Sequence, residues 1–408
     1  MVAQVKFQRW LLMFWLVLFL LAKYAAQFFP GIGLSYLQNH WHFHAETIGL
    51  IAASYFYPYL LLQVPAGIIV DHFRLSVVLC VAMLCCALGM TGFAMAQGFS
   101  MLMISRSLMG AGFAFATVAY MRAAQDYFHP KVFHRLSGAF GTICMGGSGL
   151  IIMVCGWAYD QYGWHGLLVC LSAFSWMMLA LGLMFYFLEK KQSSKRSLSS
   201  FDWGQTLHQV VAILKRKNNW LLLAFNGLAF SPVAVFGGLW GKGYLEHVFQ
   251  LPTEQATWAI STLFYGYALG GASLPYVFTS LKQQKQWMIG GITLALGVFL
   301  YIVYGLDASC GFWPLVGALS AMGFASSAFL ASYTLTQATN AYASMATAIA
   351  IINMGDPIFG GIAEPLMGKI MDMTHGNYSD GMLVLVVYWV LAIGVACWVR
   401  YEPVGINR

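Results

Sequence analysis

The sequence predicts an all-α membrane protein with twelve transmembrane helices. Of its 408 residues, 60% are hydrophobic and 9% are charged, and the mean hydropathy is +0.70. Soluble domains carry about a quarter charged residues, so this composition points to a chain that lies mostly in lipid. A helix needs about 20 apolar residues to cross ~30 Å of hydrocarbon. Runs of this kind occur at 11–37, 46–70, 76–97, 101–121, 136–158, 167–187, 219–247, 255–279, 287–306, 311–335, 345–371 and 381–400.

The first run, 11–37, begins too early and is too long for a cleaved signal peptide, so we expect it to remain as a helix. The 8 cysteines are scattered and form no CxxC pair. This spacing indicates neither a disulfide framework nor a zinc site.

The distribution of lysine and arginine predicts the orientation in the membrane. With both termini in the cytoplasm, seventeen of the 21 Lys and Arg fall in cytoplasmic segments, and the outer loops proper carry none. This is the asymmetry that the positive-inside rule describes. We therefore expect a bacterial inner-membrane protein with cytoplasmic N and C termini. The net charge of +7 follows from topology, so the expected surroundings are the lipid bilayer and not nucleic acid, and we expect a monomer.

A basic, Ser-rich segment divides the chain into three predicted parts. These are a six-helix bundle at 1–188, a cytoplasmic linker with an amphipathic helix at 189–218, and a second six-helix bundle at 219–408. A shift of about 208 residues places FYPY at 56–59 on FYGY at 264–267, and a G-x-x-x-D pattern at 156–160 recurs at 368–372. Duplicated six-helix halves are the plan of secondary transporters with a binding site near the membrane midplane.

The junction after the second run, QVPAGIIVDHFRLS, carries a candidate gating motif of Gly67, Asp71 and Arg74. Glycine allows close helix approach, and Asp71 can face the N-terminus of a neighbouring helix. The junction resembles the G-x-x-x-D-R-x-G-R loop of the major facilitator superfamily. His72, Arg74 and Leu75 replace the usual Arg, Gly and Arg, which leaves the arginine side of that gate in question.

A second motif strengthens the resemblance. In the fourth run, Arg106, Gly110 and Gly112 are similar to the superfamily's R-x-x-x-G-x-G signature. The resemblance covers the whole chain and implies the superfamily's fold of two six-helix halves. The stretch YFYPYLLLQVPAGIIVDHF also resembles the phagosomal amino-acid and nucleoside transporters of intracellular bacteria, although drug exporters share the fold and much of the glycine pattern.

Charged residues inside the apolar runs are candidates for function because each costs at least ~2.5 kcal/mol in a helix centre. Lys23 lies near the middle of the first run, Asp356 near the middle of the eleventh, and Arg106 in the fourth. We expect Lys23 or Arg106 to bind a substrate carboxylate, and Asp356 to bind an amine or carry the coupling proton. A static Lys23–Asp356 salt bridge is the structural alternative, and Glu364 is expected to pack near the outer mouth.

Polar residues in the same runs extend the predicted binding site. Tyr24 and Gln27 neighbour Lys23, while Asn226 and Tyr265 lie in the seventh and eighth runs. A tyrosine packs its ring while its hydroxyl group binds a ligand. We predict these four residues as substrate contacts, with core packing as the alternative for each.

The outer loop NHWHFHAE contains His40, His42 and His44. Alternate spacing does not enforce metal geometry, so solvated histidines are expected and no metal site is predicted. A lid that responds to pH remains an alternative.

The chain lacks the G-x-x-x-x-G-K-[ST] phosphate-binding motif and any other enzymatic signature. No enzyme activity and no cofactor are expected, and the proton gradient is the predicted energy source. The sequence thus favours a symporter that imports a small polar, zwitterionic or anionic metabolite, most plainly an amino acid, by proton-coupled alternating access. The alternatives are a proton-driven exporter of drugs or of a metabolite such as a siderophore, and a non-transporting sensor. The lack of a sizeable soluble signalling domain argues against the sensor.

Overall fold

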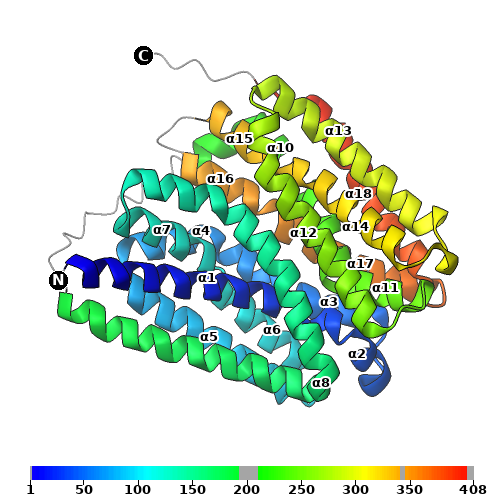
Figure 1. Cartoon of the computed structure of the whole chain (residues 1–408), viewed down its shortest axis with the longest axis horizontal. Coiled ribbons are helices and arrows are strands. Elements are labelled where there is room, and N and C mark those ends of the chain that lie inside the picture. Colours follow the sequence, from blue (N-terminus) through cyan, green and yellow to red (C-terminus); the bar gives the residue numbers. More distant parts are fainter. Residues whose placement is uncertain (1, 193–209, 341–344, 402–408) are drawn as a thin grey trace.

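The computed structural model describes residues 2–192, 210–340 and 345–401, and every assigned element in them is a helix (Figure 1). Most of the segment in which the amphipathic linker helix is expected, 193–209, lies outside the described residues. The prediction of that helix therefore stays a prediction.

The described residues of the first half form eight helices, one of which is much longer than the others. They are α1 (Val2–Ile32), α2 (Leu34–Trp41), α3 (Ala45–Ala53), α4 (Phe56–His72), α5 (Leu75–Ala94), α6 (Phe99–Phe113), α7 (Ala116–Tyr127) and α8 (Pro130–Gln192). The long α8 is not one rod, because Gly163 adopts φ 67°, a conformation that side-chain-bearing residues rarely adopt. This break separates the two runs expected at 136–158 and 167–187.

The second half repeats this pattern of long and interrupted helices. Its α-helices are α10 (Lys217–Val235), α11 (Gly241–Val248), α12 (Thr253–Val277), α13 (Leu281–Leu300), α14 (Phe312–Ser326), α15 (Ala331–Thr339), α16 (Met345–Asn353), α17 (Gly355–Met373) and α18 (Tyr378–Trp398). Short π and 3₁₀ turns join some of them, at η1 (Phe236–Trp240), η2 (Tyr301–Gly305), η3 (Ala308–Cys310) and η4 (Ser327–Leu330).

Nine helical stretches of the described residues are long and apolar enough to cross a membrane. One of them, Ala139–Phe187, contains Gly163 and so covers two expected spans. The expected spans 255–279 and 345–371 correspond to α12 and to α16 with α17, which are not among the nine. The polar content of α17 explains why this helix is not among the nine, since its charged residues are Asp356, Glu364, Lys369 and Asp372. The all-helical membrane class agrees with the prediction, while the count of twelve remains a prediction.

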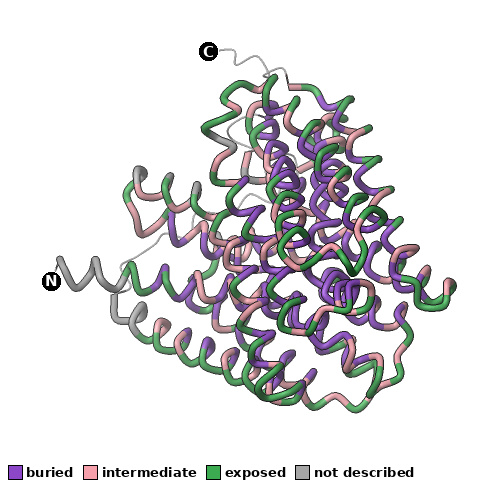
Figure 2. The backbone as a smooth tube through the Cα atoms, turned by 45° about the vertical axis from the view of Figure 1, so that its right-hand side comes forward, coloured by how far each residue is buried: buried purple, intermediate pink, exposed green. Residues whose placement is uncertain are grey.

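Burial follows the pattern of a helix bundle in lipid. Buried residues run through the middle of the bundle, and exposed residues follow its outer surface (Figure 2). Large apolar side chains are among the exposed ones, including Phe14, Leu61, Tyr276 and Trp398. In water such a surface would be costly, whereas hydrocarbon solvates it.

Several expected spans are interrupted near their middle. The second is divided at 54–55 between α3 and α4, the fourth at 114–115 between α6 and α7, and the eleventh at Met354 between α16 and α17. At each interruption some backbone N–H groups donate to the carbonyl group three residues back, as in Tyr55 to Ala52, Phe115 to Gly112 and Met354 to Ile351. The backbone is therefore hydrogen-bonded through the breaks, as the lipid surroundings require.

The two halves touch most closely at the ends that the sequence predicts to face outward. A Cβ atom on Gly31 of α1 would lie 2.3 Å from the Gly238 carbonyl oxygen in η1. One on Gly49 of α3 would lie 2.4 Å from the Glu364 carbonyl oxygen in α17, the neighbour of α3 in Figure 1. Only glycine permits backbones this close, so these positions hold the halves together at this end.

Polar groups join the halves at the same end. The Asp372 carboxylate of α17 accepts hydrogen bonds from the backbone N–H groups of Ala45, at 2.9 Å, and Glu46, at 2.8 Å, which open α3. Lys242 of α11 donates to the Ile32 carbonyl oxygen at the end of α1, at 3.2 Å. Both contacts satisfy groups that a helix terminus leaves unpaired.

Candidate functional site

Lys23 lies on α1 with its ammonium group against two tyrosine rings. Its Nζ is 4.9 Å from the ring centroid of Tyr24 and 5.0 Å from that of Tyr59 on α4. Tyr59 in turn stacks on Tyr55, with ring centroids 6.0 Å apart. Aromatic faces attract a cation without neutralising it, so the lysine stays available to an anion.

Asp356 lies in the first turn of α17, directly after the break at Met354. Its Oδ1 is buried and has no hydrogen-bond partner among the described residues. The charges of Asp356 and Lys23 act on each other, but these two described side chains do not approach within the 4.0 Å of an ion pair. The direct salt bridge considered from sequence is therefore not formed in this structure.

The second half contributes a polar group around Asn226 of α10. Its amide donates to the Ser332 hydroxyl at 3.1 Å, while its Oδ1 is buried without a partner in the described residues. On α15, the Tyr333 hydroxyl donates to Asn353 Oδ1 at 2.8 Å. The residue after Asn226, Gly227, packs against the Gly355 backbone, so this part of α10 lies beside the turn that carries Asp356.

The repeat relation connects the two halves at this point. The residue 208 positions after Lys23 is Ser231, whose hydroxyl donates to the Asp356 backbone carbonyl oxygen at 3.4 Å. Ser231 thus supports the turn that carries Asp356, whereas the corresponding position of the first half carries the cation Lys23.

The other predicted contacts divide into neighbours of Lys23 and residues elsewhere. Tyr24 is buried beside Lys23, and Gln27 is buried one turn further along α1. Tyr265 is 37% exposed on α12 and directs its hydroxyl to the Met153 sulfur atom of α8, 3.1 Å away. The structure therefore brings Tyr24 to the site and gives Tyr265 a contact elsewhere.

Arg106 is held by backbone and is 1% exposed. Its guanidinium donates to carbonyl oxygens of α1 and α3, those of Ala26, Gln27, Ile51 (3.4 Å) and Ala52 (3.1 Å). The Ile51 carbonyl also accepts from the Ser54 hydroxyl, and the Ala52 carbonyl from the Tyr55 N–H, so the guanidinium adds to the bonds that close the end of α3. In this arrangement Arg106 binds a helix end and offers little to a solute.

The predicted gating motif is described only in part. Gly67 lies in α4, where an added Cβ would meet nothing within 4 Å, and Arg74 is the N-cap residue of α5. The side chain of Asp71 lies outside the described residues. The gating role stays a prediction.

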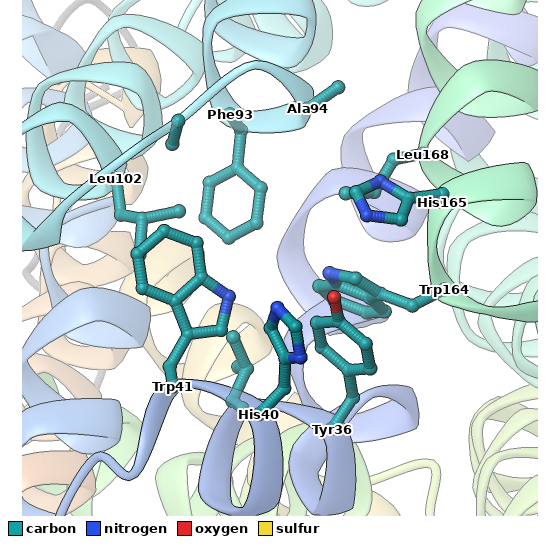
Figure 3. A pocket seen from close by; sticks show the side chains of 11 residues that line it. Tyr36, His40, Trp41, Phe93, Ala94, Leu102, Trp164, His165 and Leu168 are labelled. Carbon is teal, nitrogen blue, oxygen red and sulfur yellow. The ribbon is translucent and has the colours of Figure 1, made fainter.

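A separate cavity of about 160 Å³ lies within the first half, at the predicted outer end (Figure 3). Figure 3 shows Tyr36, His40 and Trp41 of α2 facing Trp164 and His165 of α8. His40 stacks on Tyr36 with ring centroids 4.7 Å apart and remains exposed, as expected for a solvated histidine. No three His, Cys, Asp or Glu gather as metal ligands in the described residues. The cavity does not include Lys23 or Asp356.

Two residues of the site are easy to overlook in the sequence. Tyr59 gives Lys23 its second ring, and its spacing of four residues from Tyr55 on a helix is the available signal. Glu364 is 5% exposed, and its Oε2 has no hydrogen-bond partner in the described residues. The charges of Arg106 and Asp356 both affect its carboxylate. The signal for Glu364 is its position as a carboxylate inside a predicted span.

Comparisons with known proteins agree with this architecture. Residues 12–364 match the family model described as Major Facilitator Superfamily. An uncharacterized transporter of Bacillus subtilis (strain 168), YybO, is 22% identical over 393 residues, covering 89% of this chain and 87% of the relative. A crystal structure of a bacterial homolog of the human lysosomal transporter Spinster, in an inward-facing and occupied conformation, matches with a TM-score of 0.71. That match has 15% identity and covers 96% of both chains, so it indicates a shared fold.

Proposed function

Because the chain belongs to the major facilitator superfamily and is a multi-pass membrane transporter, we propose that it imports a small zwitterionic metabolite, an amino acid in the simplest case, together with protons. The transporter class also means that the chain is not an enzyme. Identity of the solute, proton coupling and placement in a bacterial inner membrane are parts of the proposal.

The observation that carries the proposal is the pair of separated opposite charges at the site. Lys23 rests on tyrosine rings, and the Asp356 carboxylate has an unpartnered oxygen, yet the two do not form an ion pair. A buried charge without a partner is costly. A zwitterion would relieve both costs at once, with its carboxylate on Lys23 and its amine on Asp356. A hydrophobic drug would leave both charges unpaired.

Proton coupling is supported by the same carboxylate. In a symport cycle Asp356 takes up a proton on the outside, which removes its charge, and the neutral acid still accepts a hydrogen bond from the solute amine. Proton and solute are then released together on the inside, so that uptake of solute depends on the proton gradient.

We also infer that this conformation is inward-facing. The closest approaches between the halves, Gly31 to Gly238 and Gly49 to α17, lie at the predicted outer end. The structurally similar Spinster homolog was crystallised in an inward-facing conformation. A site closed on the outside and reached from the cytoplasm is one of the two states required by alternating access.

Uptake of a panel of labelled amino acids into cells or proteoliposomes, with and without a protonophore, tests the function. We expect accumulation that the protonophore abolishes, and loss of accumulation in Lys23→Ala and Asp356→Asn. Lys369→Ala, a change of an exposed lysine on α17, is the matched control and should transport normally. If no amino acid accumulates while a dye or siderophore is extruded, the export alternative replaces the proposal.

A further inference from the structure

Glu364 is a buried carboxylate without an assigned role. It lies on α17, two turns beyond Asp356, and is 5% exposed. Its Oε2 has no hydrogen-bond partner in the described part of the chain. An ionised carboxylate buried without partners is strongly disfavoured, so this arrangement suits the neutral acid.

The natural ionic partner of Glu364 is occupied elsewhere. The charge of Arg106 acts on Glu364, yet these two described residues do not form an ion pair. The Arg106 guanidinium is instead held by carbonyl oxygens of α1 and α3. Pairing with an ionised Glu364 would compete with these bonds and so disturb the end of α3.

Glu364 also lies where the two halves close. The backbone of α3 at Gly49 packs directly on the Glu364 carbonyl group, with an ideal Cβ position only 2.4 Å from the oxygen. The same two helices are joined by the Asp372 carboxylate, about two turns beyond Glu364 on α17. Separating α3 from α17 would admit water to Glu364, and bringing them together would remove it.

We propose that Glu364 is the residue whose protonation permits the outer ends of the two halves to close. The inference rests on the proposed proton coupling and adds to it a second proton-binding carboxylate, placed at the outer gate. Ionised Glu364 keeps α3 and α17 apart because closure would bury its charge. Neutral Glu364 allows the arrangement observed here.

Charged and titratable groups approach Glu364 from several helices. Arg106 faces it from α6 and Asp356 from its own helix. Tyr57 of α4 donates to the Gly361 carbonyl oxygen at 3.3 Å, and the charge of Glu364 acts on its hydroxyl. From α3 the contact is backbone, because Glu46 lies at the outer start of that helix.

The test measures the outer gate directly and needs no solute. Spin labels are placed at Asn39 on α2 and Gln255 on α12, exposed positions in opposite halves that we call the outer label pair. The background is full-length protein with its 8 native cysteines replaced, reconstituted in lipid. Electron–electron distance distributions are then recorded from acidic to alkaline pH.

In the otherwise native chain, the closed population should grow as pH falls, by up to about tenfold per pH unit while one proton is taken up. Glu364→Gln should stay closed at all pH values. Asp356→Asn should keep the pH response, and Glu364→Asp, which still titrates, should keep it as well. If size-exclusion chromatography shows that Glu364→Gln does not fold, Glu364→Asp is the variant in which the pH response is measured.

Two results would overturn the inference. One is a pH response in Glu364→Gln equal to that of the native chain, and the other is a gate that does not respond to pH at all. A pH response lost only in Asp356→Asn would assign the proton to Asp356 and would also overturn it. Failure of amino-acid uptake with an intact Glu364-dependent response would reject the solute proposal alone.

Discussion

Asp372 offers the clearest single perturbation of the outer gate. Its carboxylate, from the second half, accepts the backbone N–H groups of Ala45 and Glu46 at 2.9 and 2.8 Å and so caps α3 of the first half. The bond exists only while the halves are closed at this end. Substitution to alanine therefore removes stabilisation from the closed state and leaves the open state nearly unchanged.

The size of the effect follows from what a helix cap contributes. Loss of an N-cap side chain costs about 0.5–2 kcal/mol, and the favourable interaction of a carboxylate with the helix dipole adds about 0.3–1 kcal/mol. Water hydrates the free N–H groups in the open state, so we take about 1–2 kcal/mol as the net change. This corresponds to a shift of about 5- to 30-fold in the closed-to-open ratio of Asp372→Ala.

The outer label pair measures this ratio at fixed pH. Asp160→Ala is the matched control because Asp160 ends the corresponding G-x-x-x-D motif of the first half, is exposed, and accepts no such backbone bond in the described residues. Changes at such a surface position stay within about 0.5 kcal/mol, roughly twofold. Equal distance distributions for Asp372→Ala and the native chain would refute the reasoning, as would an equal shift in Asp160→Ala.

Three further predictions follow from other contacts. Arg106→Met should lower thermal stability in detergent by about 2 kcal/mol, since it removes charged hydrogen bonds to four buried carbonyl groups, and an unchanged melting temperature would contradict this. Gly49→Ala should shift the outer label pair towards the open state because its Cβ meets backbone at 2.4 Å, whereas Gly67→Ala, with nothing within 4 Å, should not. Hydrogen bonds from Ser309 lower the pKa of Asp307, so the turn η3 is stabilised above the ordinary Asp range and loses this support as pH falls through the lowered value. Amide protection at 306–312, expressed relative to the intrinsic exchange rate at each pH, should therefore fall in acid, and Asp307→Asn should remove this pH dependence of the protection.

Some features follow from the sequence because they are local. Apolar runs and the lysine and arginine asymmetry predict a multi-pass helical membrane protein, since the cost of polar groups in lipid acts residue by residue. The same cost singles out Lys23 and Asp356 as unusual, and their joint role in binding stays a prediction. The motif at Arg106 likewise points to the superfamily that the family comparison confirms.

The roles of individual residues depend on partners far along the chain, and only the tertiary structure supplies these. Arg106 is a plausible solute ligand by charge alone, but carbonyl groups 54 to 80 positions away occupy it. In the sequence Asp372 is an ordinary acidic residue near a helix end. Its role as a cap depends on the N–H groups at the start of α3, 327 positions away. Glu364 becomes a gate candidate only because Gly49 brings another backbone over it. Transfer cost into lipid is a property of each residue, whereas hydrogen-bond partners are decided by how the two halves pack.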